Sequence, residues 1–280
     1  MPKKTLKKSR LLKMIQKEYN VYQLRNGRPA PILSWKQYGG AGIVVGETEF
    51  EFNETVDGNV VTMIDKKIKG FPECFMMEFK VFEGQIYAYL ISLSSIKNCR
   101  PGSLVATRDL VIAILKYADS HGAKWVELQD ETTICEGGDP VSLADYYMLT
   151  RGKTWYESIT GFLPDKVDDI SYTRDTVTTN LWGDIMGKFK RMNAPIYNKF
   201  VKELLTVMPI PNNGELAMNV FSRIPESSRC ALYGKYMNFF LISSNISSIK
   251  GFKWYLPFAQ DIVRPSNSNT DWNIQLTKEE

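Results

Sequence analysis

Hydrophobic and polar residues alternate along the chain from Ile43 onward, which is the pattern of β-strands. The segment Thr48-Glu49-Phe50-Glu51-Phe52 alternates, Asp57-Gly58 is a strong turn signal, and residues 60–64 complete a predicted hairpin. A second predicted hairpin covers residues 75–93, with its turn in the middle. Four strands in succession predict an antiparallel meander.

The period changes from two to 3.6 after the meander. Apolar residues then recur on one broad face of a predicted helix: Leu110, Val111, Ile114, Leu115 and Ala118. Thr107 is the predicted N-cap, and Gly122 is the predicted residue just past the helix end. Residues 125–129 are predicted to form a strand that joins the sheet by a crossover connection.

Helical patterns dominate the rest of the chain. Ser142 is the predicted cap of a helix over residues 143–150, which Gly152 ends. Residues 173–208 predict two helices broken near Asn193-Ala194-Pro195. Residues 215–246 are predicted to be mostly helical, around a break at Pro225.

These patterns predict three regions and a mixed α/β (α+β) fold. Residues 1–42 form a basic tail and a loop-rich entry segment, and residues 43–165 form an α/β domain. Residues 166–280 form a mainly helical C-terminal region. The predicted sheet is mixed and mainly antiparallel, and helices flank it.

Composition places the chain among folded globular proteins. Its 280 residues are 44% hydrophobic and 12% aromatic, which is enough for a substantial core. An apolar run of about 18 residues, which a transmembrane helix needs, is not found. The N-terminus has no apolar segment before a cleavage site, so we expect an intracellular protein of the cytoplasm, nucleus or a virion.

Charge is concentrated at the N-terminus. Residues 1–17 carry seven Lys or Arg and no acid, whereas the whole chain has a net charge of +4, so the remainder carries −3. Such an arm can bind nucleic acid, an anionic membrane surface or an import receptor. It can also be a solubilising terminus. Its leucines could give a helix one apolar side.

The four cysteines and the single histidine predict no metal site. The cysteines are scattered and form no C-x-x-C pair: Cys74, Cys99, Cys135 and Cys230. We therefore expect buried free thiols and no disulfide framework. His121 follows a predicted helix and is expected to cap it or lie on the surface.

Residues 85–164 resemble a known family. The order strand, polar loop, helix, strand and helix ends in Trp155-Tyr156-Glu157 and Gly161-Phe162. This order is similar to the cofactor-binding half of acyl-CoA-dependent acyltransferases of the GNAT superfamily. The resemblance implies a GNAT-like sheet, acetyl-CoA as cofactor, and an amine or protein as acyl acceptor.

The resemblance also implies site residues. In the family, backbone amides of the loop before the helix hold the cofactor pyrophosphate. The matching residues are Arg100, Gly102, Ser103, Leu104, Val105 and Ala106. Tyr156 matches the tyrosine that protonates the departing thiolate, and its alternative role is packing. The general base would be Glu78, Glu127 or Asp130, which otherwise are solvent-facing residues on or beside strands.

Two interpretations of function remain. One is a divergent N-acyltransferase. The other is a non-catalytic structural or interaction protein on a degenerate GNAT-like fold, such as a virion or scaffold component. It is favoured by Arg100-Pro101-Gly102-Ser103-Leu104-Val105-Ala106, which lacks the family's glycine spacing. The run from Leu143 to Ser158 is also similar to proteins of nucleocytoplasmic large DNA viruses.

Overall fold

The computed structural model describes residues 42–45, 48–57, 60–135 and 139–258. These form two compact units, one of residues 42–126 with 257–258 and one of residues 127–256. The sequence placed a boundary near residue 165, whereas the chain passes between the units at Val126–Glu127 and at Leu256–Pro257. The predicted basic tail, residues 1–17, lies outside the described residues.

The first unit is built on the predicted meander, and both predicted hairpins are confirmed. Each strand pairs antiparallel with the next in the sequence, and a short strand precedes the four that were predicted. The strands are β1 (Gly42–Val45), β2 (Thr48–Asp57), β3 (Val60–Asp65), β4 (Phe75–Phe82) and β5 (Gln85–Leu93).

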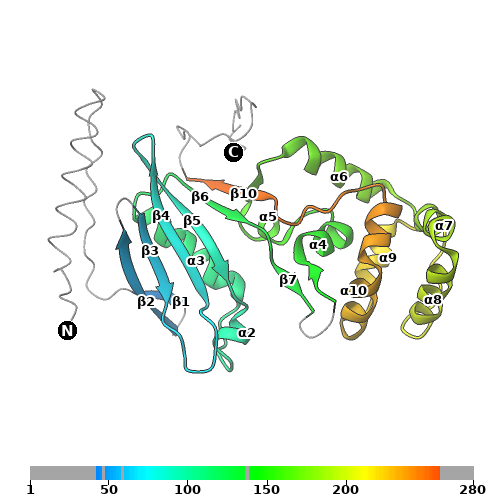
Figure 1. Ribbon diagram of the computed structural model, residues 1–280, viewed down its shortest axis with the longest axis horizontal. Helices are drawn as coiled ribbons and strands as arrows, with labels where there is room; N and C mark the ends of the chain where they lie inside the picture. The colour runs from blue at the N-terminus through cyan, green and yellow to red at the C-terminus, as the bar shows by residue number, and fades with distance from the viewer. Residues whose placement is uncertain (1–41, 46–47, 58–59, 136–138, 259–280) are drawn as a thin grey trace, which may run out of the picture. The chain divides into compact units, whose positions relative to one another are not determined.

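Helix α3 (Thr107–Ser120) covers one face of this meander (Figure 1). The core of the first unit lies between the helix and the sheet. The five predicted apolar residues of α3 are buried, and Phe75, Met77 and Phe79 alternate inward from β4. The predicted N-cap is wrong. Ala106 occupies that position, and the Thr107 hydroxyl accepts a hydrogen bond from the Ile96 amide at 3.1 Å.

Strand β6 (Trp125–Gln129) joins the sheet beside β5, as predicted. The fold is mixed α/β, and its mainly antiparallel eight-stranded sheet has the order β1-β2-β3-β4-β5-β6-β10-β9. Strands β9 (Leu163–Pro164) and β10 (Lys253–Pro257) were not predicted. Residues 253–257 lie in the region predicted to be mainly helical, yet they form a strand in which Trp254 and Tyr255 are buried.

The second unit begins with a small hairpin of β7 (Thr133–Ile134) and β8 (Val141–Ser142). Helix α4 (Leu143–Arg151) follows at once. The Ser142 hydroxyl accepts from the Asp145 amide, and Gly152 ends the helix in a left-handed conformation, as the sequence predicted. Helix α5 (Trp155–Thr160) then carries the aromatic element.

Five further helices complete the second unit. The predicted break at Asn193 is confirmed, but three helices cover the segment for which two were predicted, because Asn180 and Leu181 are extended. The helices are α6 (Val167–Thr179), α7 (Trp182–Met192), α8 (Ala194–Leu205), α9 (Ala217–Arg223) and α10 (Glu226–Ser243). Buried aromatic rings hold α7, α8, α9 and α10 together: Phe189, Phe200, Phe221 and Phe240.

The expectation of free thiols is wrong. Cys74 pairs with Cys99 in the first unit, and Cys135 pairs with Cys230 in the second, with Cα atoms 5.2 and 5.1 Å apart. All four cysteines of the chain are therefore disulfide-bonded. Their wide sequence spacing hid the pairing, because the fold alone brings the partners together.

In the part of the chain that the structure describes, every helix is too short or too polar to cross a membrane.

Candidate functional site

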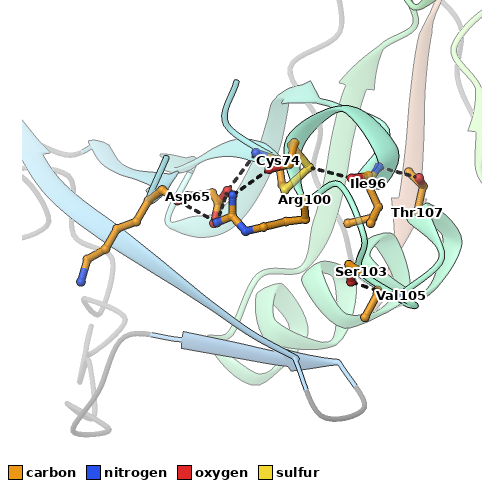
Figure 2. Close-up of a disulfide and its surroundings, with 9 residues drawn as sticks. Asp65, Cys74, Ile96, Arg100, Ser103, Val105 and Thr107 are labelled. Carbon is orange, nitrogen blue, oxygen red and sulfur yellow. Dashed lines mark hydrogen bonds and ion pairs between the residues drawn. A yellow bond between two sulfur atoms is a disulfide. The ribbon is translucent and has the colours of Figure 1, made fainter. Parts of the chain in front are cut away.

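The loop that the resemblance assigns to cofactor binding joins helix α2 (Ile96–Cys99) to α3 in the first unit. Both of its ends are fixed (Figure 2). The Cys74–Cys99 disulfide anchors α2 to the residue before β4, and the Ile96 amide bonds to Thr107. Gly102 turns the chain at φ +84°, a conformation that side chains disfavour.

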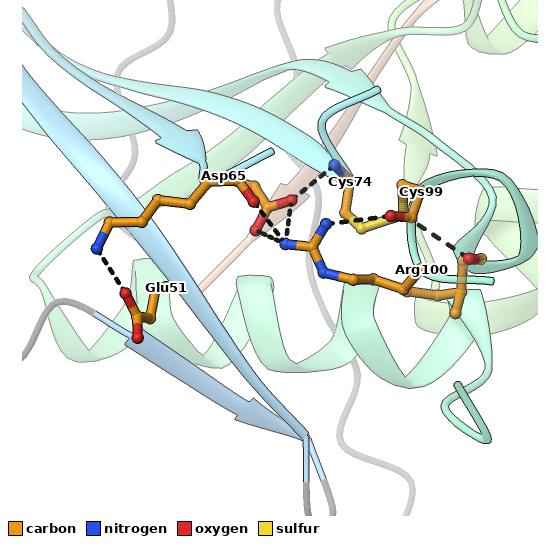
Figure 3. A network of polar contacts seen from close by, with 7 residues as sticks. Glu51, Asp65, Cys74, Cys99 and Arg100 are labelled. Atoms are coloured by element: carbon orange, nitrogen blue, oxygen red, sulfur yellow. Dashed lines mark hydrogen bonds and ion pairs between the residues drawn. A yellow bond between two sulfur atoms is a disulfide. The ribbon is translucent and has the colours of Figure 1, made fainter. Parts of the chain in front are cut away.

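Arg100 begins this loop, and its guanidinium is already bound within the protein (Figure 3). Its Nη2 donates to Oδ1 and Oδ2 of Asp65 at 2.9 and 3.0 Å and to the Lys66 carbonyl at 2.7 Å. Its Nη1 donates to the Cys99 carbonyl at 3.1 Å. The guanidinium also lies 5.7 Å from the centre of the Phe50 ring. Arg100 is therefore a structural cation here.

Asp65 is the buried partner of this pair. Its side chain is 0% exposed and that of Arg100 is 12% exposed. Burial raises the pKa of Asp65, while the hydrogen bond from the Cys74 amide and the charge of Arg100 oppose that rise. Removing Arg100 would leave this carboxyl group buried without its cation, which is costly.

The remaining loop residues bond mainly to one another. The Ser103 amide donates to the Arg100 carbonyl at 3.0 Å, and the Val105 amide donates to the Ser103 hydroxyl at 3.2 Å. The Leu104 side chain is fully exposed. The amides of Ser103 and Val105, which the resemblance assigns to phosphate binding, therefore already donate hydrogen bonds within the loop.

Tyr156 lies in the second unit, on α5. Thr154 and Glu157 form a reciprocal capping box at the start of this helix, and Arg174 binds the Glu157 carboxylate. Tyr156 is 5% exposed, and its ring contacts the rings of Trp155 and Phe162 edge to face. The sequence element Trp-Tyr-Glu with Gly-Phe therefore forms a packed cluster.

Asp130 follows β6 and interacts electrostatically with Tyr156. Burial raises the pKa of Tyr156 and the nearby charge of Asp130 raises it further, whereas a hydrogen bond with Thr132 lowers it. These causes keep the phenol protonated. Two residues that the sequence analysis named separately are thus brought together.

The environment of Asp130 is unusual for an aspartate. The residue is 1% exposed, and its Oδ1 accepts from the Thr132 amide at 3.3 Å. Its Oδ2 is buried without a hydrogen-bond partner among the described residues. Burial raises the pKa of Asp130 to about 6, the Thr132 hydrogen bonds oppose this rise, and the charge of Asp145 adds to it.

Asp145, on α4, is the second buried carboxyl group of this cluster and was not predicted. It accepts hydrogen bonds from the Ser248 hydroxyl at 2.6 Å and the Ile249 amide at 2.8 Å. It thereby ties the segment before β10 to α4. Burial raises the pKa of Asp145, and these hydrogen bonds act against that rise. Its full set of partners indicates a structural role.

The other two predicted bases have different surroundings. Glu78 lies on β4 between buried Met77 and Phe79, and its carboxylate pairs with Lys80 at 2.7 Å. Lys80 lies over the Tyr89 ring at 5.1 Å. Glu127 is half-buried on β6, where it alternates with buried neighbours. Glu78 and the loop belong to the first unit, whereas Glu127 and Tyr156 belong to the second.

Among the described residues, no group of three or more His, Cys, Asp or Glu side chains could hold a metal ion. Comparison with protein-family models, with curated proteins and with solved structures found no match for this chain.

Proposed function

We propose that this chain is a non-catalytic structural or interaction protein on a divergent GNAT-like scaffold. One observation carries the proposal: Arg100, the only basic residue of the loop, is held by buried Asp65 and two backbone carbonyls. A pyrophosphate that recruited Arg100 would have to leave Asp65 buried without its cation. Breaking a buried ion pair in this way costs about 3–5 kcal/mol.

Two further features support this proposal. The Cys74–Cys99 disulfide and the Ile96–Thr107 hydrogen bond fix both ends of the loop, which limits its rearrangement around a ligand. Tyr156 is almost completely buried in an aromatic cluster, so a departing thiolate could reach it only after that cluster opens.

The proposed setting is a virion, one of the compartments expected from the sequence. Disulfides persist in oxidising environments, which include virion surfaces, and this protein has two of them. Residues 1–17 supply the proposed contact with a polyanion, either nucleic acid or an anionic surface, because they carry all of the net positive charge.

Isothermal titration of acetyl-CoA into the oxidised full chain tests the proposal. We expect no saturable heat at millimolar ligand, and Arg100→Ala should give the same trace as the natural protein. Saturable binding that Arg100→Ala weakens would show that Arg100 leaves Asp65 to hold the cofactor, and the proposal would fail.

The second candidate function is N-acyl transfer, favoured by the electrostatic interaction of Asp130 with Tyr156 in the second unit. In this scheme the acceptor amine attacks the acetyl-CoA thioester, forming the C–N bond as the C–S bond breaks. Asp130, whose pKa is about 6, takes the amine proton, and Tyr156 gives its proton to the thiolate.

An acetyl-transfer assay with an amine acceptor decides this candidate. Tyr156→Phe and Asp130→Asn should each abolish most product formation, whereas Trp155→Phe, a packing control on the same helix, should retain it. Absence of product with the natural protein, or equal activity in all variants, excludes this scheme.

A further inference from the structure

Two arginines lie on a pair of tyrosines in the second unit. The Arg151 guanidinium lies 4.5 Å from the centre of the Tyr147 ring, and that of Arg229 lies 5.4 Å from the Tyr146 ring. The two rings meet edge to face, 5.6 Å apart. Helix α4 supplies three of these residues and the first turns of α10 supply Arg229.

These arginines differ from the others that carry ion pairs in the described chain. Arg100, Arg174 and Arg223 each bind a carboxylate. Arg151 and Arg229 have no carboxylate within 4.0 Å in the same described ranges, and the Arg229 Nε is buried without a hydrogen-bond partner. A buried donor without a partner is costly. The described residues therefore leave the charge of Arg229 without a carboxylate partner, and an anion could fill that role.

Both guanidinium charges affect the same tyrosine, Tyr146. Burial raises the pKa of Tyr146, and the charges of Arg229 and then Arg151 oppose that rise. The charges of both arginines therefore act on Tyr146, whose ring meets that of Tyr147. Exposed Glu226, one turn before Arg229, is the acid that acts on this tyrosine, and it forms no ion pair with Arg229 within the described ranges.

The surroundings hold Arg229 in place. Its neighbour Cys230 is bonded to Cys135, which attaches the start of α10 to the segment after β7. Tyr146 packs edge to face on Tyr233 at 5.1 Å, and the Tyr233 hydroxyl donates to the Phe221 carbonyl at 2.9 Å. Because the rings and the helix start are fixed, little conformational entropy is lost when a ligand binds.

We propose that Arg151 and Arg229 form a binding site for a phosphate group, either inorganic phosphate or a phosphate monoester. A phosphate dianion presents several oxygens, so it can accept hydrogen bonds from two guanidinium groups at once. A carboxylate has only two oxygens and is less suited to bridge two arginines. Its residues belong neither to the loop of residues 100–106 nor to residues 1–17.

Titration of inorganic phosphate into the oxidised full chain at low ionic strength tests this site. We expect saturable binding that Arg151→Gln and Arg229→Gln each weaken about tenfold or more, the loss for one charged hydrogen bond. Lys153→Gln is the matched control, since it removes one exposed charge two residues after Arg151 but no aromatic contact, and it should bind like the natural protein.

Further arms keep the test decisive. Arg151 is exposed, so Arg151→Gln should fold even if Arg229→Gln does not, and Arg229→Lys should bind more weakly because it lacks the planar fork. Displacement of phosphate by a nucleoside monophosphate identifies the monoester form, and its failure identifies free phosphate. The proposal would be overturned if phosphate showed no saturable binding, or if Lys153→Gln weakened phosphate binding as much as the arginine variants do. It would also be overturned if the two arginines were needed for binding single-stranded DNA but not for binding phosphate.

Discussion

The Nη2 atom of Arg100 donates to both carboxylate oxygens of Asp65, at 2.9 and 3.0 Å, from a residue 35 positions later in the sequence. The Cys74 amide donates to the same carboxylate, and the Cys74–Cys99 disulfide lies beside it (Figure 3). One buried carboxyl group thus joins the end of β3, the start of β4 and the loop after α2.

Arg100→Ala should lower the free energy of unfolding by about 3–5 kcal/mol, because Asp65 is then buried without its cation. Denaturant unfolding measures this change. Arg223→Ala is the control, since its pair with Glu215 is exposed to solvent, and it should cost much less than Arg100→Ala. Equal effects of the two substitutions would show that the Asp65–Arg100 pair contributes no more than a surface pair.

Asp130→Asn should flatten part of the pH dependence of stability. The pKa of Asp130 rises from 3.8 to about 6 on folding, so the folded state holds the extra proton between these values. Stability from this group therefore falls as pH rises through that window, by about 3 kcal/mol in total. Near neutral pH, Asp130→Asn should therefore have a higher free energy of unfolding than the natural protein. Below about pH 4 this advantage of the variant should be smaller.

Thermal unfolding across this pH range measures the Asp130 effect. Asp175→Asn, which changes an exposed carboxylate on α6, should follow the pH profile of the natural protein. If the stability of Asp130→Asn has the same pH profile as that of the natural protein, the Asp130 carboxyl group does not titrate in a buried site.

Both disulfides should contribute to stability. Cys74→Ser with Cys99→Ser removes a crosslink across 25 residues, and Cys135→Ser with Cys230→Ser removes one across 95. The chain-entropy model gives about 3 kcal/mol for the shorter loop and about 4–5 kcal/mol for the longer one. Denaturant unfolding of the two double variants measures these losses, and a thiol assay of the denatured natural protein should detect no free thiol. Four reactive thiols would contradict the pairing.

Deletion of residues 1–17 should abolish salt-dependent binding to DNA or anionic vesicles, because the remaining chain has a net charge of −3. The melting temperature should hardly change. A salt titration of the natural protein should show a steep fall in affinity as counterions compete. Undiminished binding by the truncated protein would place the polyanion-binding surface elsewhere.

Local patterns in the sequence predicted much of the fold. The meander, α3, β6, α4 and the break at Asn193 each depend on alternation, helical periodicity or a turn residue within a few positions. Strand β10 could not be found in this way, because its assignment depends on pairing with β9, about 90 residues earlier in the sequence.

The candidate site was predictable only in part. Tyr156 and Asp130 were both named from local context, but their proximity depends on packing in the second unit. The sequence contains one indication that Asp65 is buried. It lies at the end of a strand, two residues after buried Met63 and therefore on the same face. Its pairing with Arg100, and both disulfides, join residues at least 25 positions apart, which no short motif records.

A crystal structure of the oxidised protein soaked in acetyl-CoA is the decisive test of the structural role of Arg100, because it observes Arg100 and the loop together. We predict no cofactor density at residues 100–106 and an unchanged Asp65–Arg100 pair. Pyrophosphate density on the loop amides, with Arg100 turned from Asp65 toward the phosphates, would contradict the account and assign the protein to acyl transfer.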